Sequence, residues 1–364
     1  MKMKTEPVGS VPRPQYLVDA LGAFSQQQIT ENELQQLFDK ALKETIQRFE
    51  ETGSPVITDG EQTKPSFATY PISGIKNLSP NGVIIPFADG HTRQLPAITS
   101  GPFHYTTYAD AYLKKAKQLT TLPVKQAVIA VSAISLLYPQ DGIKDYSQEE
   151  FINDLLQEAE ADIRRCLNSG AYNVQIDFTE GRLALKLDPS KGLLKSFIDL
   201  NNRVLARFSA DERKRIGVHS CPGGDHDSTH SADIGYTDLL PLLFELNAGN
   251  FYLEYAGEKN KQDVLQSIKE NLRPDQTVFI GVTNVLNPRV ESPEEIRDTI
   301  IEAAEKIPLQ QLGTTDDCGF SPFADDVSTS RDTAFAKIKS RIEGTKLAEQ
   351  QLFKQNQTLN YIAN

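Results

Sequence analysis

Strand-like and helix-like segments alternate along this chain, and the alternation restricts the folds that it can adopt. Short runs rich in apolar and β-branched residues predict buried strands at 4–12, 54–61, 127–132, 173–178, 216–218, 251–255, 277–282 and 309–313. Helical patterns lie between several of these runs, at 31–52, 108–120, 147–168, 193–208 and 330–349. About eight such repeats favour a single (β/α)8 TIM barrel over residues 1–364.

Residues 70–107 interrupt this alternation. They contain proline, glycine and short β-rich runs in place of a helical pattern. We therefore predict a β-rich insertion that covers one rim of the barrel and does not form a domain of its own.

Composition excludes several classes of protein. The chain is 39% hydrophobic and 24% charged, which is enough to bury a core, and its net charge of −11 argues against nucleic acid or an anionic membrane as a partner. No apolar run approaches the length of a membrane span and no signal peptide is evident, so a cytoplasmic location is expected. Three cysteines do not make a disulfide framework in a chain this long, and Cys166, on a predicted helix, is expected to be a buried structural residue.

The other two cysteines lie near predicted strand ends with groups that bind metals. His219 and Cys221 follow strand 216–218 two residues apart, so an extended backbone projects the imidazole and the thiol from one face. Glu254 stands where an apolar residue is expected, and Cys318 lies in a turn-forming Asp-Asp-Cys-Gly context. One nitrogen, two sulfurs and one carboxylate predict a tetrahedral zinc site.

Short motifs recur at the predicted strand ends: Val8-Gly-Ser10, Asp59-Gly-Glu61, Gln175-Ile-Asp177, His219-Ser-Cys221, Glu254 and Asp317-Cys-Gly319. Jointly they resemble the catalytic barrel of the cobalamin-independent methionine synthase family, which implies a barrel of the uroporphyrinogen decarboxylase and methionine synthase type. The resemblance runs from residue 5 to about 345, without the N-terminal half-barrel of full-length members, and is therefore to a short, core-only relative. The loop after Cys221 also resembles that of epoxyalkane:coenzyme M transferases, a sister group that uses the same zinc chemistry on another thiol.

The resemblance implies a zinc-dependent methyltransferase that activates homocysteine as a zinc thiolate and methylates it to methionine. It implies that the zinc ligands, which are also the catalytic residues, are His219, Cys221, Glu254 and Cys318, and that Ser10, Glu61 and Asp177 hold the amino-acid part of the substrate. Zinc is suited to this reaction because a thiol attacks as its thiolate, and coordination removes the thiol proton. Two carboxylates offer acceptors for an α-ammonium, and a serine with its neighbouring N–H offers donors for a carboxylate.

Departures from the family pattern concern the methyl donor. Asp177 is followed by Phe178-Thr-Glu180 in place of the family's Glu-Pro, and Leu286 stands where folate-dependent members have a histidine proton donor. The chain has no tryptophan on which a pterin could stack. Methyltetrahydrofolate needs protonation at N5, so we expect another donor: a methylated protein, a corrinoid partner or another methyl compound.

Three other functions stay open at this point. Alkyl transfer to another thiol, such as coenzyme M, would call for cations near its sulfonate, and Arg13, Lys64 and Arg182 lie near the same strand ends. A metal-free barrel akin to uroporphyrinogen decarboxylase would need basic residues for propionates and would leave both thiols without a role. A non-enzymatic, zinc-stabilised partner protein is disfavoured, because structural zinc is usually held by closely spaced ligand pairs.

Overall fold

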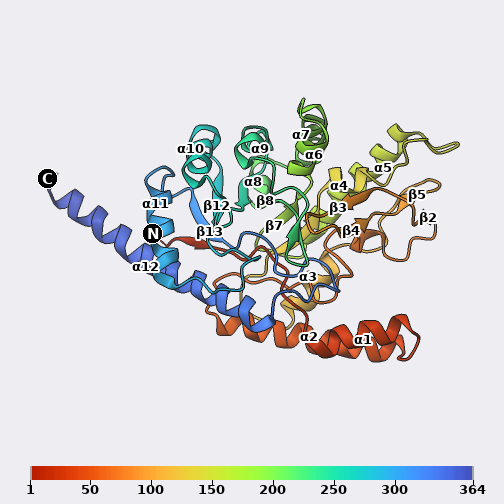
Figure 1. Cartoon of the computed structure of the whole chain (residues 1–364), viewed down its shortest axis with the longest axis horizontal. Coiled ribbons are helices and arrows are strands. Elements are labelled where there is room, and N and C mark those ends of the chain that lie inside the picture. The colour runs from red at the N-terminus through yellow and green to blue at the C-terminus, as the bar shows by residue number, and fades with distance from the viewer. Residues whose placement is uncertain (1, 363–364) are drawn as a thin grey trace.

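A parallel sheet forms the centre of the computed structural model, which describes residues 2–362, with side chains described for residues 2–353. The sheet has seven strands in the order β1-β13-β12-β11-β8-β7-β6 (Figure 1). They are β1 (Lys4–Thr5), β6 (Gln126–Ile129), β7 (Val174–Asp177), β8 (Ile216–Ser220), β11 (Asn250–Leu253), β12 (Thr277–Gly281) and β13 (Leu312–Thr315). All of their residues except Lys4 are buried, as expected of a parallel sheet covered on both faces. The predicted α/β class is confirmed, while the ends of the predicted domain 1–364 lie outside the described residues.

Helices connect the strands and cover the sheet. They are α1 (Gln15–Ser25), α2 (Glu31–Glu51), α3 (Asp110–Lys117), α4 (Val131–Ser135), α5 (Gln148–Asn168), α6 (Gly181–Leu187), α7 (Gly192–Leu205), α8 (Ala210–Arg213), α9 (Tyr236–Leu243), α10 (Lys261–Asn271), α11 (Pro293–Ala304) and α12 (Arg331–Ile362). Capping boxes fix where several begin: Ser147 and Glu150, for example, satisfy each other's backbone N–H groups at the start of α5. Within residues 2–362, no helix combines the length and the apolar character that a membrane crossing requires.

The predicted strand at 54–61 is wrong as a regular strand. Only Ile57 pairs, in a parallel bridge with Val124 just before β6. Pro55 has no N–H to donate, and Gly60 and Glu61 turn the chain with φ of 65° and 55°. The segment nevertheless also contacts the chain after β1, at the opposite edge of the sheet, because the Val11 N–H donates to the carbonyl of Gly60 at 3.1 Å. The edge strands of the sheet are β1 and β6, which do not pair with each other. The hydrogen bonds of the sheet therefore do not close a regular barrel of eight strands.

Other strand boundaries also differ, and the strand predicted at 4–12 is regular only at Lys4–Thr5. The last strand begins at Leu312 and not at 309, because the chain turns first, with Gln311 N–H bonded to the carbonyl of Pro308 at 2.8 Å. The strand predicted at 127–132 ends at Ile129 and is followed directly by α4. The predicted helices at 31–52 and 147–168 match α2 and α5 closely.

The β-rich insertion at 70–107 is confirmed. It forms two small antiparallel sheets, β2 (Leu78–Ser79) with β5 (Ala97–Ile98), and β3 (Ile84–Pro86) with β4 (Thr92–Gln94). It reaches the loop after Cys221, where β9 (Gly224–Asp225) and β10 (Ser228–Thr229) form a short hairpin, and the Ala88 N–H donates to the carbonyl of Thr229 at 3.0 Å. The insertion therefore lies over the ends of the strands that the sequence analysis singled out.

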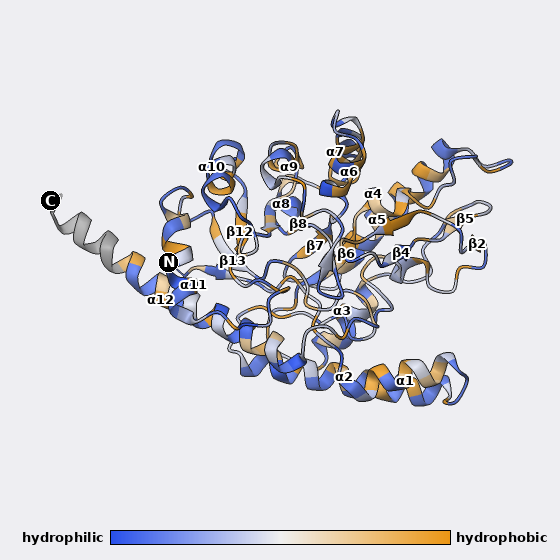
Figure 2. Ribbon diagram, viewed as in Figure 1, coloured by the Kyte–Doolittle hydropathy of each residue, from blue (hydrophilic) through white to orange (hydrophobic). Residues whose placement is uncertain are grey.

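The core is one large apolar cluster between the sheet and its helices. A smaller second cluster forms where α1 and α2 pack together, around Leu17, Ala20, Leu34 and Ala41. Both helices carry apolar as well as polar residues (Figure 2), as expected of helices with one buried face. Figure 1 shows this pair beyond the sheet, with α12 running beside it.

Candidate metal centre and substrate pocket

His219 is fixed by the strand next to its own. It lies on β8 opposite Tyr252 of β11, and its Nδ1 is 3.1 Å from the carbonyl oxygen of Tyr252. A carbonyl can only accept, so Nδ1 carries the proton and Nε2 keeps its lone pair. Nε2 is buried and has no hydrogen-bond partner among the described residues. A buried imidazole held in this tautomer is typical of a histidine that ligates a metal.

The thiols of Cys221 and Cys318 complete a cluster around this imidazole. Their Sγ atoms are 3.1 Å apart, although the residues are 97 positions apart in the chain. The ligand atoms of His219 and the two cysteines all lie within 4.8 Å of one another. The hydrogen bond between the two thiols lowers the pKa of Cys221 well below its ordinary value and raises that of Cys318. The cluster thus stabilises one thiolate even without a metal.

Glu254, the fourth predicted ligand, is buried beside this cluster but does not belong to it. Glu254 follows β11 directly, and its Oε2 is 3.2 Å from Nη1 of Arg182, in an ion pair. Burial and the charge of Asp317 raise the pKa of Glu254, while Arg182 opposes that rise. The structure therefore brings three of the four predicted ligands together and holds the fourth on an arginine.

The donor set fits zinc. An imidazole nitrogen with a free lone pair and two adjacent thiols are the ligands that zinc prefers, and a carboxylate close by can supply the fourth. Cys166, in contrast, is fully buried on α5, and burial raises the pKa of its thiol well above the usual range. Its predicted structural role agrees with this environment.

A cavity of about 400 Å³ opens beside the cluster and is lined by His219 and Cys318. Ser10, Glu61 and Asp177, the predicted substrate residues, line the same cavity. Ser10 is attached to the loop after Cys318, since its Oγ accepts from the Ser321 N–H at 3.2 Å. A side chain at Gly319 would place its Cβ 2.1 Å from that Oγ, so glycine is required for this approach.

Glu61 has a buried counter-ion that the sequence analysis did not assign to it. Nζ of Lys64 is 3.0 Å from Oε1 of Glu61 and also donates to the carbonyl of Ala127 at 3.0 Å. Burial disfavours the charge on Lys64, but Glu61 and Asp59 outweigh burial and raise its pKa. Asp59, whose Oδ1 accepts from the Glu61 N–H, keeps Oδ2 buried without a partner among the described residues. The pocket thus holds more carboxylates than the single lysine neutralises.

Asp177 ends β7 and stands opposite His219 in the sheet register. Gln175 donates to its Oδ1 at 2.7 Å. Burial, followed by the charge of Glu61, raises the pKa of Asp177 to about 6. A cation in the cavity would therefore stabilise the charged form of Asp177, which is the property that an α-ammonium site requires.

The three cations near the strand ends are already bound within the chain. Arg13 donates to the carbonyls of Glu61 and Lys64, both at 2.8 Å. Lys64 pairs with Glu61, and Arg182 pairs with Glu254 and Glu258. None of the three is free to hold a sulfonate, so the coenzyme M alternative is not favoured.

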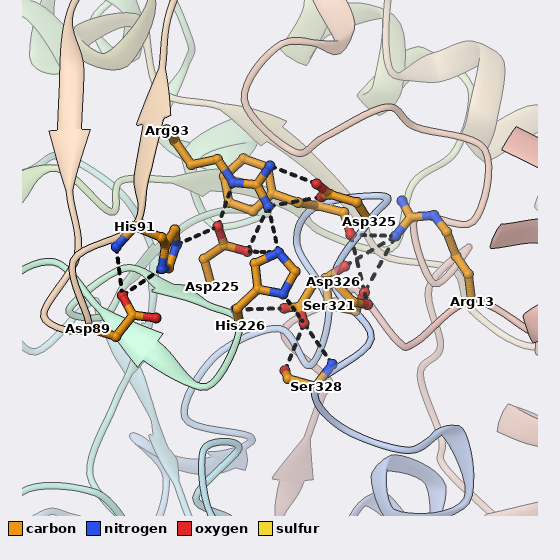
Figure 3. A network of polar contacts seen from close by, with 11 residues as sticks. Arg13, Asp89, His91, Arg93, Asp225, His226, Ser321, Asp325, Asp326 and Ser328 are labelled. Carbon is orange, nitrogen blue, oxygen red and sulfur yellow. Dashed lines mark hydrogen bonds and ion pairs between the residues drawn. The ribbon is translucent and has the colours of Figure 1, made fainter. Parts of the chain in front are cut away.

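A charged cluster closes the mouth of the cavity, and we call it the mouth network: Arg93, His91, Asp225, His226, Asp325 and Asp326 (Figure 3). Arg93 of β4 lines the cavity and donates to Asp225 at 3.0 Å and to both carboxylate oxygens of Asp325 at 2.9 Å. His91 contacts Asp225 at 3.0 Å, and His226 lies 3.2 Å from Arg93. The network joins the insertion, the hairpin after Cys221 and the loop after Cys318. Sequence reasoning missed it, because nothing in the local sequence of these three segments shows that they meet.

Aromatic side chains line the outer part of the cavity, and sequence reasoning missed these too. Phe67 and Phe323 meet edge to face at 5.6 Å, and Phe87 of the insertion also lines the space. The three phenylalanines make this part of the cavity apolar. Leu286, the residue predicted to stand in place of the family's histidine, is half-buried and packs against the core.

Comparisons with known proteins place the chain in one family. The sequence profile of the family described as "Cobalamin-independent synthase, Catalytic domain" matches residues 3–334. A methionine synthase of Sulfurisphaera tokodaii is 20% identical over 96% of this chain and 94% of the relative, and one of Pyrococcus furiosus is 22% identical over 98% and 96%. A B12-independent methionine synthase structure from Shewanella sp. W3-18-1, in complex with selenomethionine, aligns with a TM-score of 0.76 at 18% identity, over 97% of this chain and 100% of that one.

The profile covers most of the chain, and the solved structure shows that the fold is shared along its whole length. The predicted resemblance is thereby confirmed. The chain belongs to the cobalamin-independent methionine synthase family, a family of methyltransferases.

Proposed function

We propose that the protein methylates homocysteine to methionine, with the substrate sulfur activated on zinc. The observation that carries the proposal is the cluster of His219, Cys221 and Cys318 beside a cavity that is lined by His219 and Cys318 and also by the buried carboxylates Glu61 and Asp177. Family membership supports methyl transfer to homocysteine, and the donor set supports zinc.

His219, Cys221, Cys318 and Glu254 would hold the zinc and would be the catalytic residues. When bound, zinc would keep the substrate sulfur as a thiolate at neutral pH. The hydrogen bond of His219 to Tyr252 keeps Nε2 directed at the cluster, and Cys221 is fully buried, whereas Cys318 lines the cavity from which substrate would enter.

Ser10, Glu61 and Asp177 would bind the amino-acid part of homocysteine. Asp177, whose pKa is raised by burial and by Glu61, would accept from the α-ammonium, and Glu61 would do so from the opposite side. Ser10 lies next to the loop after Cys318. Its hydroxyl would therefore donate to the substrate carboxylate while the substrate sulfur binds at the cluster. The excess of acidic over basic groups in the pocket favours an amino acid over a thiol that lacks an ammonium.

The methyl donor would be a compound other than methyltetrahydrofolate. Leu286 provides no proton at the position of the family's histidine, and the chain has no tryptophan on which a pterin could stack. The apolar outer cavity, with Phe67, Phe87 and Phe323, is the space where the donor's methyl group would approach. We further propose that residues 1–364 act as one catalytic barrel, closed by the irregular segment 54–61.

Methionine formation by the purified zinc-loaded protein tests the proposal. Homocysteine is offered with methylcobalamin or with methyltetrahydrofolate, and the Cys318→Ser variant serves as the inactive control. We expect methionine with methylcobalamin and none above the control with methyltetrahydrofolate. Equal or faster turnover with methyltetrahydrofolate would contradict the donor assignment, and no product with either donor would contradict the proposed reaction.

A further inference from the structure

Arg182 lies between two carboxylates next to the metal-binding cluster. It belongs to α6, its side chain is 2% exposed, and its Nη1 is 3.2 Å from Oε2 of Glu254 and 2.6 Å from Oε1 of Glu258. One guanidinium nitrogen is thus shared by a predicted zinc ligand and by a residue that has no assigned role.

The guanidinium is the fixed member of this group. Its Nε donates to the carbonyl of Ile234 at 3.0 Å, and its Nη2 donates to the same carbonyl. The ring of Tyr236 lies 5.0 Å from the guanidinium carbon. Glu254, by contrast, is attached to the end of β11 by a side chain with three rotatable bonds, and only Oε2 is paired with Arg182. A change of partner would therefore move Glu254 and leave Arg182 in place.

The second carboxylate has a physical consequence. A buried arginine that loses its only anion is strongly destabilising, because the charge is left in a medium of low dielectric constant. If Glu254 turns toward the cysteines, Glu258 still neutralises Arg182. The arrangement therefore permits Glu254 to have two positions without leaving a buried charge unpaired.

We propose that Arg182 is a positioning residue that receives the carboxylate of Glu254 whenever substrate sulfur takes the fourth place at the metal. This inference rests on the proposed function. With zinc held by the four residues, the entering thiol would lose its proton to solvent, and its sulfur would take the place of the Glu254 oxygen. Arg182 stabilises the displaced carboxylate, so it favours the exchange at the expense of metal affinity.

Two variants with opposite expected effects test the inference. Arg182→Gln removes the alternative partner, so Glu254 stays with the cluster: zinc should bind more tightly, and homocysteine more weakly by about tenfold. Glu258→Gln leaves Glu254 as the sole anion of Arg182, so zinc should bind more weakly and homocysteine more tightly. Arg164→Gln, which breaks the ion pairs of Arg164 with Glu160 and Glu212 on the outer surface, is the control and should change neither.

Zinc affinity is measured by competition with a chelator, and homocysteine affinity by the thiolate-to-metal absorption band of the cobalt(II)-substituted protein. Opposite shifts in the two variants support the inference, whereas a general loss of structure would weaken both affinities together. The inference is overturned, and the proposed function is not, if Arg182→Gln and Glu258→Gln each behave like the wild type. The same holds if each of them binds zinc and homocysteine more weakly. Absence of the band in wild-type protein at saturating homocysteine overturns the proposed function as well. If Arg182→Gln does not fold, Glu258→Gln still decides, because unchanged or tighter zinc binding in that variant contradicts the inference.

Discussion

The imidazole of His219 and the backbone of Tyr252 lie in register on adjacent strands, with Nδ1 3.1 Å from the carbonyl oxygen. The contact determines which ring nitrogen is free and therefore which atom can bind a metal. It also ties the candidate metal centre to the interior of the sheet, since β8 and β11 are buried along their whole lengths.

Removal of a cluster ligand should remove the metal. His219→Ala, Cys221→Ser and Cys318→Ser should each reduce zinc content, measured by mass spectrometry of the purified protein, from about one per chain toward zero. Cys166→Ala is the matched control, because that thiol is buried on α5 away from the cluster, and it should retain zinc. Retention of full zinc content in Cys318→Ser would contradict the assignment of that residue as a ligand.

Asp177→Asn should weaken homocysteine binding with little effect on zinc content. A charge-assisted hydrogen bond to the ammonium is lost, so KM for homocysteine should rise by roughly 10- to 100-fold. Zinc content measured on the same preparation separates this effect from damage to the metal centre. An unchanged KM would exclude Asp177 from the ammonium site.

Homocysteine binding should depend on pH through the same carboxylate. Burial and Glu61 raise the pKa of Asp177 to about 6, so this group is charged above that pH and neutral below it. The affinity for the ammonium should therefore be full near neutral pH and should fall as the pH drops through 6. Homocysteine affinity is measured between about pH 5 and 8 and corrected for zinc lost at low pH. In Asp177→Asn the corrected affinity should change little with pH. A wild-type profile with no step near pH 6 would contradict the prediction.

Lys64→Met should destabilise the fold, because it leaves Glu61 buried with no counter-ion. The side chain of Lys64 is 1% exposed, and loss of one partner of a buried pair costs about 3–5 kcal/mol. Adding Glu61→Gln should restore part of that free energy of unfolding, measured with urea. A single variant as stable as the wild type would show that the pair is not a structural element of the pocket.

Arg93→Gln should open the mouth network. Arg93 bridges Asp225, whose side chain is fully buried, and Asp325 on another loop, so its loss frees three segments at once. Amide hydrogen exchange should become faster in residues 84–94 and 224–229, while the strands at the cluster keep their protection. Unchanged exchange in both segments would show that the apolar contacts of the insertion hold it closed without the ion pairs.

Sequence reasoning predicted the elements whose signal is local. The i and i+2 spacing of His219 and Cys221 correctly predicted that their side chains lie close together, with His219 on β8 and Cys221 directly after it. The helical patterns at 31–52 and 147–168 likewise predicted α2 and α5. The β-rich insertion followed from its own composition, and Cys318 from its turn context.

What sequence reasoning missed depends on partners far away in the chain. Arg182 pairs with Glu254 over 72 positions, and Arg93 with Asp325 over 232, and periodicity gives no information about such pairs. The segment 54–61 has the composition of a strand, but Pro55 and the positive φ of Gly60 and Glu61 break its pairing. That same irregularity brings Glu61 beside Lys64, so the departure from a regular strand contributes directly to the pocket.

Zinc K-edge X-ray absorption of the purified protein, with and without homocysteine, tests the central claim most directly. We predict a metal bound by one nitrogen, two sulfur atoms and one oxygen, in which homocysteine replaces the oxygen with a third sulfur. A metal shell that stays the same on addition of saturating homocysteine would contradict the account.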